Sequence, residues 1–126
     1  MFTFVTGGLR SGKSGYALRR ASELGPPPWL YVAAHIEGDD ELKARLAGTP
    51  TKVDSDLLGE VETLADRLYR STTPVVLVTT EIGLGFLPAS VPDRRLINVA
   101  GLANQILSDR AASVVMMVSG VALRLR

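Results

Sequence analysis

A glycine-rich stretch near the start of the chain holds the residues with the clearest chemical potential. Residues 7–14 read GGLRSGKS, a full match to the phosphate-binding pattern G-x-x-x-x-G-K-[ST]. Glycines let successive backbone N–H groups converge on phosphate oxygens, and a helix that follows adds the partial positive charge of its N-terminus. The stretch therefore predicts a loop that binds the phosphates of a nucleotide.

The residue types in this loop suggest individual roles. Lys13 is expected to reach the β- and γ-phosphates of GTP or ATP and to act in catalysis, while Ser14 is expected to bind Mg²⁺ through its hydroxyl. Arg10 either adds a further phosphate contact or is simply solvated. A turn that merely packs a helix on a sheet has no need of Lys13 and Ser14 in this register. The expected nucleotide contacts are Gly7, Gly8, Leu9, Arg10, Ser11, Gly12, Lys13 and Ser14.

The Mg²⁺ ion implied by Ser14 usually needs an acid at the end of a neighbouring apolar strand as well. Glu81 is the best candidate, because it lies two residues beyond the apolar run Val75–Thr79. We expect Glu81 to bind the metal and to take part in catalysis. The alternatives are that Glu81 is an exposed loop acid, or that the metal ligand is Asp39 or Asp40, although both aspartates also suit a helix cap.

The apolar pattern of the chain supplies a scaffold for these residues. Runs of strand length alternate with stretches of helical period. Helices are expected over 17–24, 39–46, 57–68 and 93–109, with a loop at Gly48–Thr51, and strands are expected at Phe2–Thr6, Trp29–Ala34, Val75–Thr79, Ser113–Ser119 and Val121–Leu125. This alternation predicts one α/β domain over residues 1–126, P-loop NTPase-like, with a mostly parallel sheet and helices on both faces.

Composition narrows the classes of function. With 126 residues, 46% of them hydrophobic, the chain suits one domain with its own core, and the absence of cysteine excludes a disulfide framework and thiolate metal sites. A formal net charge of +1 gives no reason to expect nucleic acid or a charged membrane as partner. The first residues lack the basic head of a secretory signal, and the longest apolar run is too short to span a bilayer. We therefore expect a cytoplasmic protein.

Four blocks of the sequence together resemble one enzyme family. The blocks are TGGLRSGKS, YVAAHIEGDDELKARL, VVLVTTEIGLGFLP and AGLANQILSDRAASVVMMVSGVALRLR. In this order they are similar to blocks of the bifunctional adenosylcobinamide kinase / adenosylcobinamide-phosphate guanylyltransferase family of cobalamin assembly. The family patterns V-T-N-E-V-G-x-G-x-V-P and A-G-x-x-N-Q, matched by the last two blocks, are far more specific than the phosphate loop alone.

The resemblance implies two reactions and an assembly. In the first reaction, the aminopropanol hydroxyl of adenosylcobinamide is phosphorylated from ATP or GTP. In the second, GMP from GTP is attached to that phosphate through a guanylylated histidine. The resemblance further implies a homotrimer with active sites between subunits, so that nucleotide, corrinoid and further copies of the chain are the implied partners.

The chain departs from this family after Leu46. There the family continues into a helix with the nucleophilic histidine, and later into a strand that ends in an aspartate, whereas this chain continues with AGTPTK at residues 47–52. A central block of several tens of residues is thus absent, which counts against the transferase step and leaves Glu81 as the remaining acid. The only histidine, His35, follows the second expected strand, and an ordinary strand-end histidine is favoured over a nucleophile.

Two other functions remain open. The chain could be a shortened paralogue that binds GTP or ATP without catalytic activity, or it could be another small P-loop kinase. Gly83 and Gly85 suit a tight turn beside the nucleotide, but an ordinary turn would look the same. Asn104 and Gln105 match the N-Q pair of the family, and such amides on a helix more often bond within the protein than to a substrate.

Overall fold

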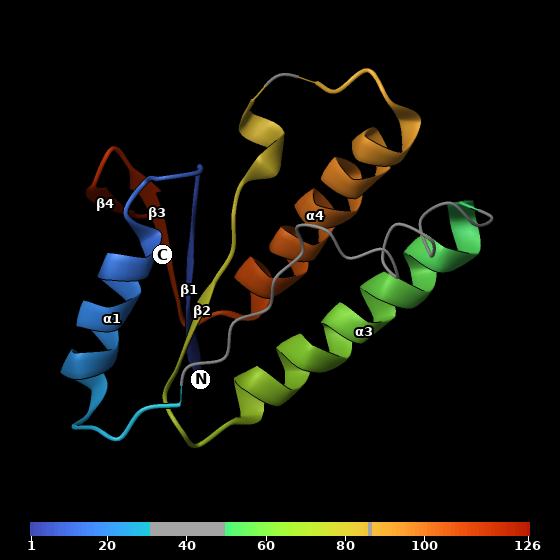
Figure 1. Ribbon diagram of the computed structural model, residues 1–126. Helices are drawn as coiled ribbons and strands as arrows, with labels where there is room; N and C mark the ends of the chain where they lie inside the picture. The colour runs from blue at the N-terminus through green and yellow to red at the C-terminus, as the bar shows by residue number, and fades with distance from the viewer. Residues whose placement is uncertain (31–49, 86) are drawn as a thin grey trace.

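A four-stranded sheet forms the centre of the fold. The computed structural model describes residues 1–30, 50–85 and 87–126, with the backbone alone for residues 50–53. In these residues the strands lie in the order β2-β1-β3-β4 (Figure 1). β1 (Phe2–Gly7) pairs in parallel with β2 (Val75–Val78) and with β3 (Ser113–Val118), and β4 (Val121–Arg124) pairs antiparallel with β3. The predicted α/β fold with a mostly parallel sheet is confirmed.

Helices cover both faces of this sheet, as predicted. α1 (Lys13–Leu24) lies on one face, and α3 (Pro50–Arg70) and α4 (Val91–Arg110) lie side by side on the other (Figure 1). A short 3₁₀ helix, η1 (Ile82–Leu84), connects β2 to the segment before α4. Among the described residues, no helix is both long and apolar enough to cross a membrane.

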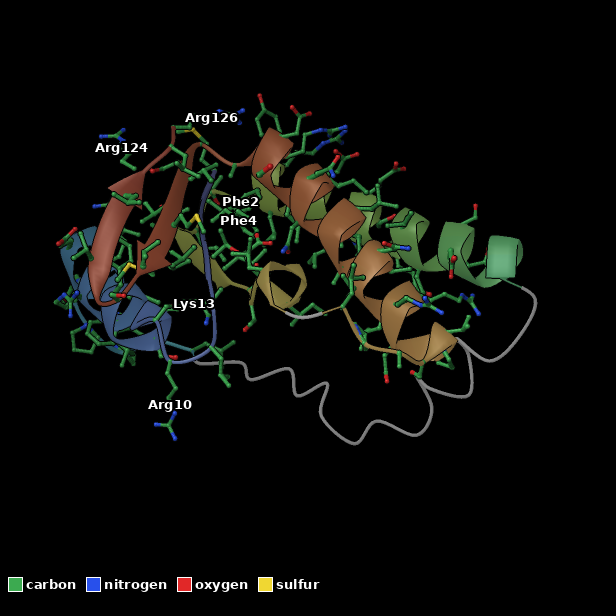
Figure 2. All side chains as sticks on the ribbon, turned by 90° about the horizontal axis from the view of Figure 1, so that it is seen from above. Phe2, Phe4, Arg10, Lys13, Arg124 and Arg126 are labelled. Atoms are coloured by element: carbon green, nitrogen blue, oxygen red, sulfur yellow. The ribbon has the colours of Figure 1, made fainter. Side chains whose placement is uncertain are left out.

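The core is divided between the two faces because side chains alternate along each strand. The face towards α3 and α4 buries Phe2 and Phe4, which are 2% and 1% exposed (Figure 2). Their cluster is completed by side chains from α3, α4, the residue that follows α4, and β3, namely Ala65, Leu107, Ala111 and Val114. The opposite face buries Val5 and two side chains of β3 against Tyr16 of α1. β1 is therefore buried along its whole length, and it holds the start of the glycine-rich loop in place.

The helices expected over 17–24 and 57–68 both begin earlier than predicted, at Lys13 and Pro50. The loop expected at Gly48–Thr51 does not extend to its last two residues, because α3 begins at Pro50. Proline suits the first turn of a helix, since its φ is preset and the N–H that it lacks would have no partner there. The first two residues of that expected loop lie outside the described residues.

The strand expected at Trp29–Ala34 is only partly described. Trp29 and Leu30 are exposed and form no strand, and the indole Nε1–H of Trp29 donates to the carbonyl of Gly25 at 3.0 Å. The other four residues of that strand lie outside the described residues. So do the helix expected over 39–46 and three residues weighed for chemistry, which are His35, Asp39 and Asp40.

The start of α4 yields a prediction about stability. Ser90 precedes the helix, and its Oγ accepts a hydrogen bond from the backbone N–H of Asp93 at 3.2 Å. Replacing Ser90 with alanine removes this cap and should lower the free energy of unfolding by about 1 kcal/mol. Ser90→Asn keeps an acceptor and should unfold close to wild type. Urea unfolding of the three proteins measures the effect, and equal stability of Ser90→Ala and wild type would contradict the capping role.

Candidate functional site

The glycine-rich loop lies at the edge of the sheet where the three parallel strands end. β1 leads into the loop, β2 leads towards Glu81, and β3 ends at the turn of Ser119 and Gly120. Two backbone hydrogen bonds of 3.0 Å join these ends. One runs from Glu81 N–H to the carbonyl of Gly7, and the other from Gly120 N–H to the carbonyl of Ser11. Open α/β sheets bind their ligands at the carboxyl ends of the strands, so this edge is the candidate site.

The backbone conformation of the loop requires glycine at two positions. Gly7 and Gly12 have φ values of 150° and 93°, which residues with a side chain rarely adopt. A Cβ at Gly7 would lie 2.4 Å from the carbonyl oxygen of Met117 and 2.8 Å from Oγ of Ser11. Arg10, with φ 57°, is exposed and points away from the sheet (Figure 2). The curl of the loop thus depends on its glycines, while Arg10 extends into solvent.

Lys13 is the first residue of α1 and lies across the loop. Its Nζ donates a hydrogen bond to the carbonyl of Gly8 at 2.5 Å. Partial burial lowers the pKa of the Lys13 ammonium below its usual value, because the charged form loses hydration. A phosphate bound to the loop would bring a negative charge to this ammonium.

Two hydroxyls of the loop have different surroundings. Ser14 is exposed in the first turn of α1, where backbone N–H groups have no acceptor within the helix, and Gly12 provides no side-chain cap. Ser11 is 7% exposed, and its Oγ has no hydrogen-bond partner among the described residues. The helix end and the two hydroxyls together offer several donors to an anion.

Glu81 lies beside the loop, and two donors hold its carboxylate. Oγ1 of Thr6 donates to Oε1 of Glu81 at 2.7 Å, and Nδ2 of Asn104 donates to the same oxygen at 3.1 Å. In the part of the chain that the structure describes, Oε2 accepts no hydrogen bond. The structure thereby brings the end of β1, the segment after β2 and the middle of α4 together around one carboxylate.

The chemistry of these side chains suits Mg²⁺. Ser14 and Glu81 offer a hydroxyl and a carboxylate, and both are the oxygen donors that this ion prefers. Within residues 1–30, 50–85 and 87–126, no three acidic, histidine or cysteine side chains gather into a possible metal site. Mg²⁺ commonly binds through one or two carboxylates together with substrate phosphates. The residues present therefore fit a Mg²⁺ ion that binds together with a nucleotide.

Some residues singled out from the sequence lie elsewhere. Gln105 is exposed next to Asn104 and borders a shallow hollow on α4 with Ile97 and Leu102. A Cβ at Gly83 would lie 3.2 Å from Cγ2 of Ile97, so this glycine allows η1 to approach α4.

A separate pocket of about 470 Å³ lies between α1 and the amino ends of β1 and β2, at the opposite end of the sheet from the loop.

Sequence reasoning missed Thr6 and the turn of Ser119 and Gly120. Thr6 is the last residue before the glycine pattern, and a hydroxyl at the end of the predicted strand Phe2–Thr6 was a usable signal. The turn has positive φ values of 49° and 82°, and a Cβ at Gly12 would lie 3.4 Å from Cα of Gly120. This contact depends on the pairing of β1 with β3, which no local pattern indicates.

Comparison with known proteins identifies similar sequences. The family profile described as cobinamide kinase / cobinamide phosphate guanyltransferase matches residues 3–52 and 49–125. The bifunctional adenosylcobalamin biosynthesis protein CobU of Salmonella typhimurium is 27% identical over 183 residues, covering 100% of both chains. The protein CobP of Pseudomonas aeruginosa is 28% identical over 170 residues, covering 100% of this chain and 98% of its own. CobU of Escherichia coli is 36% identical over 67 residues, 53% of this chain and 37% of its own.

The same comparisons locate an interruption inside the chain. The two matched segments meet at residues 49–52, and the full-length alignments run over 183 and 170 positions, whereas this chain has 126 residues. Since these two alignments cover all of this chain and nearly all of the relatives, the difference in length lies in the interior. Its position agrees with the central block that the sequence pattern lacks after Leu46.

Proposed function

This chain belongs to the cobinamide kinase / cobinamide phosphate guanyltransferase family, and on that basis we propose that it phosphorylates adenosylcobinamide with GTP or ATP in the assembly of the cobalamin nucleotide loop. The observation that supports this most strongly is the meeting of the loop 7–14 with Glu81 at one edge of the sheet. Backbone N–H groups, an ammonium and a carboxylate at one edge are the parts that phosphoryl transfer uses.

In this proposal each residue has a defined task. The loop N–H groups and Lys13 bind the β- and γ-phosphates and stabilise the charge of the transferring phosphoryl group. Ser14 and Glu81 hold Mg²⁺, which when bound neutralises charge on the phosphate oxygens. The oxygen of the aminopropanol hydroxyl forms a bond to the γ-phosphorus as the bond to the β-phosphate oxygen breaks. The hydroxyl proton passes to solvent and a nucleoside diphosphate leaves.

The proposal is limited to the kinase step. Guanylyl transfer through a histidine needs a neutral imidazole as nucleophile. The segment that holds this histidine in the resembling family has no counterpart here, and the family match is interrupted at that position. The same interruption favours the alternative function, a nucleotide-binding paralogue without catalytic activity.

Further copies of the chain are proposed as partners, in a homotrimer as the family resemblance implies. Large apolar side chains on the β3–β4 hairpin support this proposal. Val118, Val121 and Leu123 are 43%, 60% and 47% exposed, and the strand register puts them on one face of the hairpin. A contiguous exposed apolar patch of this kind is typical of protein–protein contacts.

The proposal is tested by incubating the protein with adenosylcobinamide, Mg²⁺ and either GTP or ATP labelled at the γ-phosphate. The expected result is transfer of the label to the corrinoid. Tight nucleotide binding without labelled corrinoid would instead support the inactive paralogue. Labelling of a non-corrinoid acceptor alone would support another small P-loop kinase. A parallel reaction with GTP labelled at the α-phosphate should leave the corrinoid unlabelled, because the nucleophilic histidine is absent.

A further inference from the structure

We infer that Thr6 and Asn104 are positioning residues. They bind one carboxylate oxygen of Glu81 and thereby determine which oxygen is available to the Mg²⁺ ion that binds with the nucleotide. The inference rests on the proposed function, in which Glu81 helps to hold Mg²⁺ beside the nucleotide. Both donors end on the same oxygen, Oε1, at 2.7 Å from Thr6 and 3.1 Å from Asn104. Oε2 is thereby left as the oxygen available to a cation.

The hydroxyl of Thr6 is itself oriented by a neighbour. Oγ1 of Thr79 donates to Oγ1 of Thr6 at 3.4 Å. A hydroxyl has a single proton to donate, so Thr6 accepts from Thr79 and gives its own proton to Glu81. The hydrogen bonds therefore run in one direction, from the end of β2 through the end of β1 to the carboxylate.

Two separate elements, β1 and α4, restrain Glu81. Thr6 is 5% exposed at the end of β1, between β2 and β3, and Asn104 is half-buried in the middle of α4. The backbone N–H of Glu81 donates to the carbonyl of Gly7 at 3.0 Å, which ties the residue to the loop itself. A side chain held from a strand and a helix is more precise than one on a free loop.

This arrangement has a consequence for metal binding. Hydrogen bonds to a charged carboxylate are short and strong, and here both engage one oxygen. Without the two donors, the carboxylate could rotate and offer either oxygen. Cation binding would then have to fix the side chain, and the entropy lost in doing so would weaken the affinity for the cation. Loss of an outer partner of a ligating carboxylate typically costs 10–100-fold in metal affinity. An ordinary structural role of Asn104, tying α4 to the sheet, predicts no such specific loss.

The experiment measures the Mg²⁺ concentration at half-maximal enhancement of GTP binding, together with GTP affinity in EDTA. Asn104→Ala should raise the Mg²⁺ midpoint about 10-fold or more while affinity in EDTA is unchanged. Asn98→Ala is the matched control, because it removes the same amide from an exposed position of the same helix. It should change neither quantity. Thr6→Val should shift the midpoint in the same direction as Asn104→Ala, and Thr6→Ser should restore it.

The outcomes separate this inference from the proposed function. A wild-type Mg²⁺ midpoint in folded Asn104→Ala overturns the inference and leaves nucleotide binding intact. Failure of the wild-type protein to bind either GTP or ATP overturns the proposed function and the inference with it. If Asn104→Ala does not fold, Asn104→Leu removes the donor at similar volume without adding a charge and should also raise the midpoint. An unshifted midpoint in that variant overturns the inference as well.

Discussion

Replacing Lys13 with alanine is expected to reduce phosphoryl transfer to adenosylcobinamide by about 10²–10³-fold or more, because under the proposed function the transferring phosphoryl group loses an ammonium that stabilises its charge. The side chain begins α1 and lies across the loop, with Nζ bonded to the carbonyl of Gly8. Arg19→Ala is the matched control, since it removes an exposed cation from the same helix. It should keep wild-type turnover. Initial rates with γ-labelled GTP and ATP measure both variants.

The stability of Lys13→Ala distinguishes a catalytic loss from misfolding. Burial lowers the pKa of Lys13, so the folded state binds this proton less tightly than the unfolded state. The ammonium therefore opposes folding at neutral pH, and this cost is relieved as the pH rises from the lowered pKa to the usual one. Lys13→Ala should thus unfold at no lower urea concentration than wild type at pH 7. Near-normal kinase activity in the folded variant would contradict the role of Lys13.

Gly7→Ala is expected to lower the free energy of unfolding by about 3 kcal/mol or more. The added Cβ would lie 2.4 Å from the carbonyl oxygen of Met117 in β3, and the φ of 150° is a conformation that alanine rarely adopts. Backbone atoms cannot move aside without separating β1 from β3. Since domains are stable by only about 5–15 kcal/mol, this variant should be partly unfolded at moderate temperature.

Gly8→Ala is the control for this effect within the same loop. A Cβ at Gly8 would meet no atom within 4 Å, so the free energy of unfolding should change by less than about 1 kcal/mol. Urea unfolding followed by circular dichroism compares the two variants with wild type. Equal stability of Gly7→Ala and Gly8→Ala would show that β1 and β3 do not approach each other as closely as described.

The amino-acid sequence alone predicted much of this fold, because its signals are local. The short apolar runs of β1 and β3 and the helical period of α1, α3 and α4 depend on residues a few positions apart. The glycine-rich loop was also predictable, since its conformation depends on residues without a side chain. The boundary at Pro50 was predicted wrongly, because a proline permits both a loop and the first turn of a helix.

Only the tertiary structure decided which residues surround the candidate site. Glu81 was singled out by its distance from an apolar run, but its two donors, Thr6 and Asn104, are 75 and 23 residues away in the chain. Their meeting depends on β1 lying between β2 and β3, and on α4 packing across the sheet face that buries Phe4. Periodicity assigns a side chain to a face of its own element. It carries no information on which elements become neighbours, because that choice follows from burying all the apolar faces at once.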